Sequence, residues 1–319
     1  MSTTWLPCGD YHQNYRADHS WFQSKFIKGK MILLFLVLFV FIPIFSDSYW
    51  LSIWYIVGFT ILGGLGVQLL IGFCGQITLG HAAFIAVGAY TSTLLILEFP
   101  WPQVLIDWGI AYPISIFIAA VVAGIWSVLF GLPSARVKGF YLILTTMAAQ
   151  FVTVDFVITQ YVAQIGGRGQ AFSLPPGTIK LGPWIIDSEL KIYYMALVLV
   201  IICVALMANL LRSRVGRAWI AIRDNDISAE VMGINVVKYK LLAFFVAGFL
   251  GGIAGSFWIS GLAAISPEHF PWFLSLQLVG VILIGGVGSI HGTIFGAIFL
   301  VVVMEMLQLA VMPLADTVP

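Results

Sequence analysis

Long apolar runs alternate with short polar stretches along almost the whole chain. Nine runs carry almost nothing but apolar side chains, at about 31–46, 49–73, 82–98, 109–133, 139–162, 191–211, 241–263, 272–287 and 291–312. A helix that crosses the hydrocarbon core of a bilayer needs about 20 such residues. The pattern therefore predicts an all-α polytopic membrane protein with about 8–10 transmembrane helices.

Two of these runs, 82–98 and 272–287, are short for a full crossing, and each adjoins a glycine-rich polar interruption. The first reads GFCGQITLGHAAF and contains Gly75, Gln76, Thr78, Gly80 and His81, and the second reads LIGGVGSIHGTIFGA and contains Gly285, Gly286, Gly288 and Gly292. Irregular backbone at membrane depth is tolerated only where it packs in protein or lines a cavity. We therefore expect two broken or re-entrant segments beside a translocation pathway near the bilayer midplane.

Some of the glycines have a simpler explanation. Four-residue spacings of small residues, such as Gly248 with Gly252 and Gly251 with Gly255, favour close helix packing. Polar side chains in lipid are costly unless they are used, which favours a place at or next to the pathway for Gln76, Thr78 and His81. His81 alone has a further interpretation, as a cap of the helix that follows it.

The run at 139–162 is the most polar of the nine. It contains Thr146, Gln150 and Asp155, and an acid within a membrane segment is a functional hypothesis by default. The acids Glu98 and Glu305 are placed to sit at the membrane interface instead. We add Thr146, Gln150 and Asp155 to the candidate pathway residues.

The composition excludes a soluble domain, because 61% of the 319 residues are hydrophobic and 9% are charged, against about 25% charged in soluble proteins. Three cysteines lie far apart without metal-ligand spacing, so no metal site is expected. The chain has neither a G-x-x-x-x-G-K-[ST] phosphate loop nor a catalytic H-E-x-x-H or Ser/His/Asp pattern. We expect no enzyme and no nucleic-acid partner, and any energy source must come from another subunit.

Basic residues indicate the orientation. Of the fifteen Lys and Arg residues, twelve lie in the segments 1–30, 134–138 and 212–240, which share one face if the helices alternate. This predicts a cytoplasmic amino-terminal leader at 1–30, a transmembrane domain at 31–319 and an extracytoplasmic loop at 163–190. The side on which the carboxyl terminus lies is left open, because the short runs need not cross.

The predicted cytoplasmic segment 212–240 also carries apolar residues. Asn225 or Asp226 can cap a helix that begins at Ile227, and Gly233 is placed to end it. Such a helix would have Ile227 and Val231 on one face, which suits docking into a groove on another protein. A solvated connector that only fixes topology is the alternative.

Three stretches carry a family resemblance: GFCGQITLGHAAFIAVGAYTSTLL, GRAWIAIRDNDISAEVMGINVVKYKLLAF and LIGGVGSIHGTIFGA. They resemble the permeases of bacterial branched-chain amino-acid ABC importers, most closely the M-type (LivM-like) subunit, over nearly the whole chain. Thr78 stands where the family usually has serine, which keeps the hydroxyl group.

The resemblance implies an ABC importer permease fold in the bacterial inner membrane. It implies a second related (LivH-type) permease, two ATPase subunits that bind ATP and Mg²⁺, and a periplasmic or lipid-anchored substrate-binding protein; no cofactor is implied for this chain. The coupling element of the family corresponds to positions 217–240, with these candidate docking residues: Arg217, Arg223, Asp226, Ile227, Ala229, Glu230, Val231 and Gly233.

Other functions stay open at this point. Urea and short-amide importers use closely similar permeases, and the transmembrane pattern does not separate them from amino-acid importers. A self-sufficient channel or secondary transporter with Asp155 as its ion site is less favoured, because both breaks lack carboxylates.

Overall fold

A computed structural model of the chain describes residues 37–134, 137, 139–162, 172–174, 179–182, 184–186, 188–262 and 264–315. The predicted leader at 1–30 and most of the predicted loop at 163–190 lie outside these ranges. The chain divides into two units between Leu51 and Ser52. In the first unit the described residues form η1 (Val37–Phe41), α3 (Ile42–Phe45) and the start of α4.

Helices dominate the second unit, as the apolar runs predict. They are α4 (Ser48–Val67) continued by the π-helix η2 (Gln68–Phe73), α5 (His81–Leu97), α6 (Gln103–Asp107), α7 (Ala111–Ser134), α8 (Phe140–Phe151) continued by the π-helix η3 (Val152–Val162), α10 (Glu189–Arg212), α11 (Arg214–Asp224), α12 (Asp226–Val231), α13 (Val236–Gly261), η4 (Pro267–His269), α14 (Trp272–Gly285) and α15 (Ile290–Ala315). Two antiparallel pairs of two-residue strands join β1 (Phe172–Ser173) to β4 (Ala264–Ile265) and β2 (Lys180–Leu181) to β3 (Trp184–Ile185).

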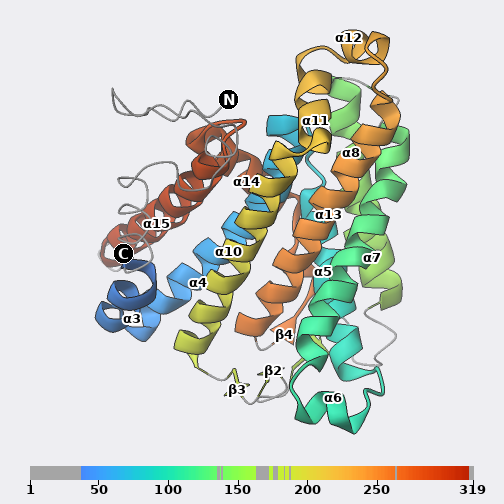
Figure 1. Cartoon of the computed structure of the whole chain (residues 1–319). Coiled ribbons are helices and arrows are strands. Elements are labelled where there is room, and N and C mark those ends of the chain that lie inside the picture. Colours follow the sequence, from blue (N-terminus) through green and yellow to red (C-terminus); the bar gives the residue numbers. More distant parts are fainter. Residues whose placement is uncertain are drawn as a thin grey trace, which may run out of the picture. The chain divides into compact units, whose positions relative to one another are not determined.

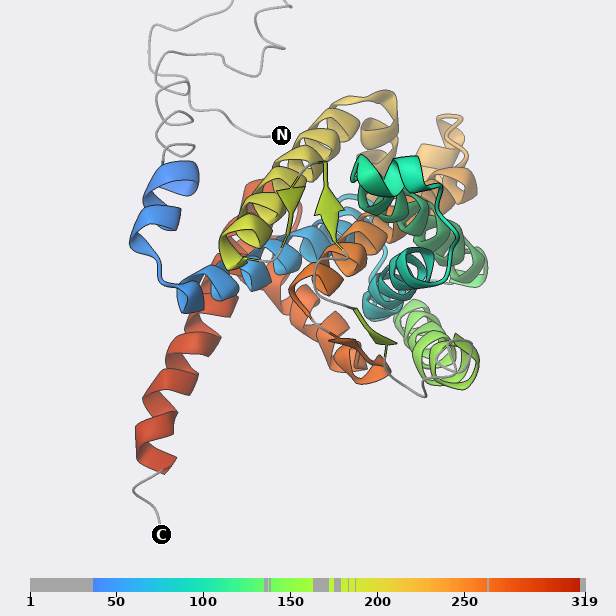
Figure 2. The same cartoon turned by 90° about the horizontal axis from the view of Figure 1, so that it is seen from below.

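Seven of the described helical spans are long and apolar enough to cross a bilayer, and α5, with 17 residues, is shorter. The predicted multi-pass helical fold is therefore confirmed. Of the two runs that are short in the sequence, 82–98 forms the short helix α5, whereas 272–287 belongs to one of the seven long spans, Pro267–Gly285. In the unit from Ser52 onward, α11 and α12 lie at one end of the bundle, and α6 with the strands lies at the other (Figures 1 and 2). We call these the α12 end and the strand end.

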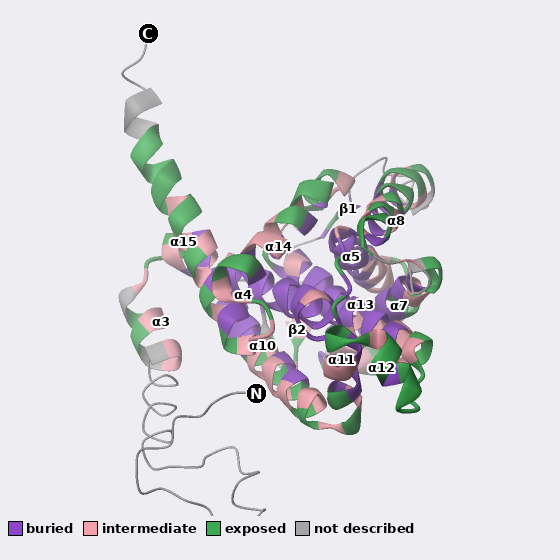
Figure 3. Cartoon of the chain, turned by 90° about the horizontal axis from the view of Figure 1, so that it is seen from above, coloured by how far each residue is buried: buried purple, intermediate pink, exposed green. Residues whose placement is uncertain are grey.

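The centre of the bundle is formed by α5 and α13, whose residues are mostly buried, and by the buried face of α7 (Figure 3). Glycines permit this packing: a Cβ atom at Gly252 of α13 would lie 2.7 Å from Ala120 Cα and 2.8 Å from Ala123 Cβ of α7. The packing interpretation of this small-residue stripe is confirmed. By contrast, α15 exposes large apolar side chains along most of its length, among them Phe295 and Phe299.

Candidate functional site

The first predicted break is present between Phe73 and His81, where residues 74–80 leave the helical conformation. Gly75 has a φ of +71°, which glycine adopts more readily than any other residue. A Cβ atom there would also lie 3.1 Å from Cγ of Arg223, so the chain turns out of the helix directly against the segment that precedes α12. The break therefore starts at the α12 end of the bundle.

From Gly75 the break runs inward, and α5 begins inside the bundle. The ring of His81 packs edge-on against Phe84 and lies beside Gly251, near the middle of α13. Both ring nitrogens of His81 are buried and have no hydrogen-bond partner among the described residues. The amino end of α5 is thus enclosed by protein, which is the arrangement that irregular backbone at membrane depth would require.

Side-chain hydroxyls satisfy the backbone donors at this amino end. Leu79 N donates to Thr146 Oγ1 at 3.1 Å, Gly80 N to Thr78 Oγ1 at 3.3 Å, and Ala82 N to Ser275 Oγ at 2.8 Å. The first amides of a helix lack intrahelical partners, and these hydroxyls replace them. Thr78 and Thr146 are fully or almost fully buried, so the structure brings them together as partners of the break itself.

The second break lies between α14 and α15, as the sequence predicts. Its glycines are of two kinds. Gly286 and Gly288 have φ angles of +106° and +86° and form the turn. Gly285 and Gly292 instead lie against each other, so that a side chain on either would overlap the other's carbonyl group.

A glutamine that the sequence analysis did not single out joins the two breaks. The buried Gln68, in η2, donates through Nε2 to the backbone oxygens of Gly286 at 3.2 Å and Ser289 at 3.1 Å. The sequence does hold a signal for it, because Gln68 interrupts the apolar run 49–73 with a polar side chain. The two breaks are therefore neighbours in space.

Arg223, at the end of α11, touches both breaks. Its Nη1 donates to Gly72 O at 2.8 Å, and the same nitrogen would lie 3.3 Å from a Cβ atom at Gly288. Its other nitrogens pair with Asp224, at 3.1 Å for Nη2. The guanidinium group thus connects the segment before α12 to the backbone of the first break and lies beside the second.

The short helix predicted after Asn225 is confirmed as α12. Asn225 Oδ1 accepts from Ile227 N at 3.0 Å and Ser228 N at 3.1 Å, and Gly233, at a φ of +86°, follows the helix end. The apolar face is open to solvent, with Ile227 67% and Val231 82% exposed. Of the other candidate docking residues, Arg217 and Glu230 are also exposed, Asp226 is half-buried and Ala229 is buried.

Two contacts fix this region to α13. Trp219 of α11 is fully buried, and its Nε1 donates to Tyr239 O at 2.8 Å. Lys240, whose side chain is 3% exposed, places Nζ 3.7 Å from an oxygen of Asp226. Movement of α12 relative to α13 must therefore disturb both a buried indole and a buried charge.

A cavity of about 420 Å³ lies between the first break and this region. Gly75 and Gln76 line one side of it, and Arg223, Asp226 and Lys240 are among the residues that line the rest. The Oε1 atom of Gln76 is buried and has no hydrogen-bond partner among the described residues. Gln76 is therefore the candidate pathway residue that lies at the α12 end.

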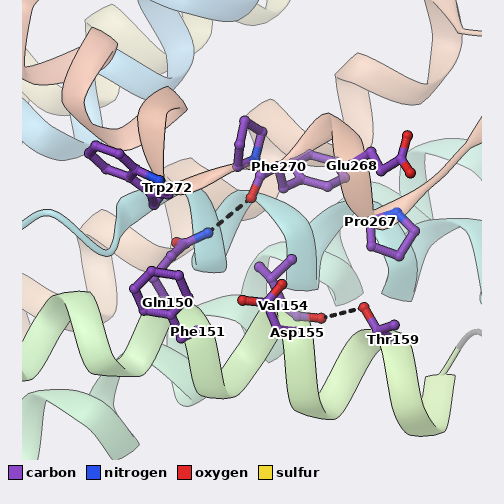
Figure 4. A pocket seen from close by; sticks show the side chains of 10 residues that line it. Gln150, Phe151, Val154, Asp155, Thr159, Pro267, Glu268, Phe270 and Trp272 are labelled. Carbon is purple, nitrogen blue, oxygen red and sulfur yellow. Dashed lines mark hydrogen bonds between the residues drawn. The ribbon is translucent and has the colours of Figure 1, made fainter.

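A second cavity, of about 290 Å³, lies between the α8–η3 helix and the η4–α14 segment (Figure 4). Gln150 and Asp155 line it, as do Phe270 and Trp272. The six candidate pathway residues therefore form three groups: Gln76 lines the first cavity, Gln150 and Asp155 line the second, and the remaining three line neither. Among the described residues, no group of three or more His, Cys, Asp or Glu is placed to hold a metal ion.

The comparison with known proteins decides the family. Residues 49–318 match the family model described as the permease component of the branched-chain amino acid transport system. The chain belongs to this family. This membership agrees with the resemblance seen in the sequence, and the seven long apolar helical spans support a multi-pass membrane protein.

The names of similar permeases mention different substrates. The chain is 28% identical over 269 residues to the high-affinity branched-chain amino acid transport system permease LivM of Escherichia coli K12, which covers 78% of this chain and 61% of that protein, and 27% identical to LivM of Salmonella typhimurium. The permease thus spans about three-fifths of the length of these relatives. A segment of 91 residues is 32% identical to the ribose import permease RbsC of Haemophilus influenzae, covering 27% of this chain and 28% of that protein. No solved structure matches the chain.

Proposed function

We propose that this permease is one subunit of an ATP-driven importer for branched-chain amino acids. It forms half of the pathway with a second related permease, two ATPase subunits supply the energy, and a separate binding protein delivers the substrate. The family match and the LivM relatives support the substrate class. The exposed apolar face of α12 is the observation that carries the mechanism.

Docking of an ATPase subunit on α12 follows from the exposure of Ile227, Val231 and Met232 (67%, 82% and 83%). A capped helix with an apolar face is a common shape for insertion into a groove on a partner protein. The face lies at the end of the bundle that the positive-inside rule assigns to the cytoplasm, where ATP is available. In this orientation the amino terminus is cytoplasmic and the membrane is the bacterial inner membrane.

Arg223 then transmits movement from the docked helix to the pathway. It precedes α12 by only a few residues, and its bond to Gly72 O reaches the first break without an intervening side chain. Gln68 continues the connection to the second break through its bonds to Gly286 and Ser289. Nucleotide-driven displacement of α12 would bias both breaks, as a two-state element in a coupled transporter must.

The test is an apolar-to-charged substitution on the docking face. Ile227→Asp in the assembled transporter should abolish copurification of the ATPase subunits and leucine uptake, because a carboxylate in an apolar groove must be desolvated. Val104→Asp is the matched control, since Val104 is also exposed (60%) but lies on α6 at the strand end. Intact ATPase association and uptake in the Ile227→Asp protein would overturn the docking proposal.

The substrate class needs a separate measurement. Urea importers have similar permeases, and sugar permeases match parts of this chain. Leucine, urea and ribose should therefore be compared as substrates of the same reconstituted complex with its binding protein. ATP-dependent uptake of leucine, and not of urea or ribose, supports the proposal. Uptake of urea or ribose, and not of leucine, would identify a different substrate class.

A further inference from the structure

The cavity between η3 and α14 has the dimensions of a small-molecule site. Its volume of about 290 Å³ lies close to the lower end of the range for such sites, which starts near ~300 Å³. Aromatic rings from Phe151, Phe270 and Trp272 and two prolines form most of its walls (Figure 4). Its polar lining residues are Gln150, Asp155, Thr159 and Glu268, and the hydroxyl of Thr159 already donates to Val154 O at 2.9 Å.

Gln150 contributes a fixed acceptor. Its side chain is almost fully buried, at 1% exposure, and its Nε2 donates to Phe270 O at 3.0 Å, which orients the amide. The other amide atom, Oε1, has no hydrogen-bond partner among the described residues. In Figure 4 the amide points from its helix into the space before Trp272. A buried acceptor without a hydrogen-bond donor costs free energy, and a donor from a ligand would satisfy this oxygen.

Asp155 contributes a negative charge on the same wall. Five residues make about 1.4 turns of an α-helix, which would direct positions 150 and 155 to different faces. The chain is π-helical from Val152, and i→i+5 bonding brings a residue closer to the one five positions earlier. Gln150 lies in the α-helical turn before this segment and is buried, whereas Asp155 is exposed, and both line the cavity. Glu268 lies at its rim, and its carboxylate points away from Asp155 in Figure 4.

The charges around the cavity have one sign. Of the described residues that line it, two are acidic and none is basic. A ligand must therefore bring both the hydrogen-bond donor and the positive charge. The rings of Phe270 and Trp272 suit an apolar chain beside that charge, and an aromatic face also attracts a cation.

We propose that this cavity binds a primary ammonium group that carries a short branched apolar chain. The ammonium group donates to Gln150 Oε1 and pairs with Asp155, and the chain lies against Phe270 and Trp272. The identification of this ligand with the amino end of the transported amino acid rests on the proposed function. If the ligand is the transported amino acid, the cavity binds its amino group, and its carboxylate binds elsewhere.

Two analogues of leucine, each with only one of its two charged groups, test which charge the cavity binds. 3-Methylbutylamine keeps the ammonium group and the branched chain but lacks the carboxylate, and 4-methylpentanoate keeps the carboxylate but lacks the ammonium group. Saturation-transfer NMR on the full chain in lipid nanodiscs at pH 7, with empty nanodiscs subtracted, reports binding of each. We expect saturable binding of the amine and none of the acid.

Variants locate the binding. Asp155→Asn keeps the shape and removes the charge, and should weaken the amine by about tenfold or more, because charged hydrogen bonds are the stronger ones. Gln150→Leu should also weaken it, provided that its melting temperature shows a folded chain. Glu98→Gln is the matched control, since Glu98 is an exposed acid outside the cavity lining, and should bind like the unaltered chain.

The outcomes bear on distinct proposals. Equal binding of both analogues, or amine binding that Asp155→Asn leaves unchanged, would overturn the ammonium site. The isolated chain needs no partner for this measurement. Amine binding together with failed leucine uptake by the assembled transporter would keep the cavity and overturn the import of branched-chain amino acids.

Discussion

At the scale of single residues, Arg223 is the contact through which we propose that coupling runs. Its guanidinium group reaches from the end of α11 to the carbonyl group of Gly72. Hydrogen bonds from charged donors contribute about 1.5–3 kcal/mol, which is enough to bias a conformational equilibrium. Under the same proposal, assembly depends instead on the exposed face of α12.

Arg223→Met should therefore separate assembly from transport. The substitution keeps most of the length of the side chain but removes its donors, so the ATPase subunits should still copurify while uptake per ATP hydrolysed falls about tenfold. Parallel measurements of leucine uptake and ATP hydrolysis in proteoliposomes give this ratio. Arg214→Met, at an exposed position of the same helix that is not among the candidate docking residues, is the control. An unchanged ratio for Arg223→Met would remove Arg223 from the coupling route.

Residues also mark the limit of prediction from sequence. The polarity of Gln76, Thr78 and His81 identifies the break but not the role of each side chain. Thr78 closes a hydrogen bond within the break, whereas Gln76 lines a cavity. This difference depends on Thr146 and Arg223, which come from distant segments, so a local pattern holds no information about it. Gln68 was missed for the same reason, since its partners lie more than 200 positions further along the chain.

At the scale of helices, apolar periodicity and capping predict most of the elements. Asn225 and Gly233 define the short helix α12 because cap and stop signals are local. The π-helical winding of η2 and η3 has no such local signal, and it changes which side chains share a face. The sequence therefore identifies Asp155 as a candidate functional acid, but it does not predict that Asp155 and Gln150 line the same cavity.

The packing of α13 on α7 gives a prediction of its own. A methyl group at Gly252 would lie 2.7 Å from Ala120 Cα, too close for any rotamer to relieve, so Gly252→Ala should destabilise the bundle by about 1–3 kcal/mol. The melting temperature of the purified chain in detergent measures this. At Gly280 of α14 the nearest atom would lie 3.8 Å away, and Gly280→Ala should leave the melting temperature equal or higher. Equal melting temperatures for the two variants would contradict close packing at Gly252.

At the scale of the whole molecule, the described residues form a helical unit with large apolar side chains left on its surface. α14 and α15 expose Phe273, Leu283 and Phe295 by more than half, and lipid or a second permease can cover them. Neither break holds a carboxylate that could bind a coupling ion. Under the proposed function, the energy for transport comes from the partner ATPase subunits.

The isolated chain should accordingly move no leucine. Liposomes that contain this chain alone and enclose radiolabelled leucine should lose label no faster than empty liposomes. Addition of the ATPase subunits, the second permease and the binding protein with ATP should produce directional uptake. Leucine flux through the chain alone, with or without an ion gradient, would identify a self-sufficient channel or secondary transporter and remove the importer proposal.

The two hydrogen bonds of Gln68 have a consequence for how such a subunit opens. Nε2 of Gln68 donates to the backbone oxygens of both Gly286 and Ser289, so a single side chain connects the first break to the second. Separation of the two breaks would leave the amide nitrogen of Gln68 without these two acceptors. We therefore expect the two breaks to separate in one step, in which both hydrogen bonds are lost together.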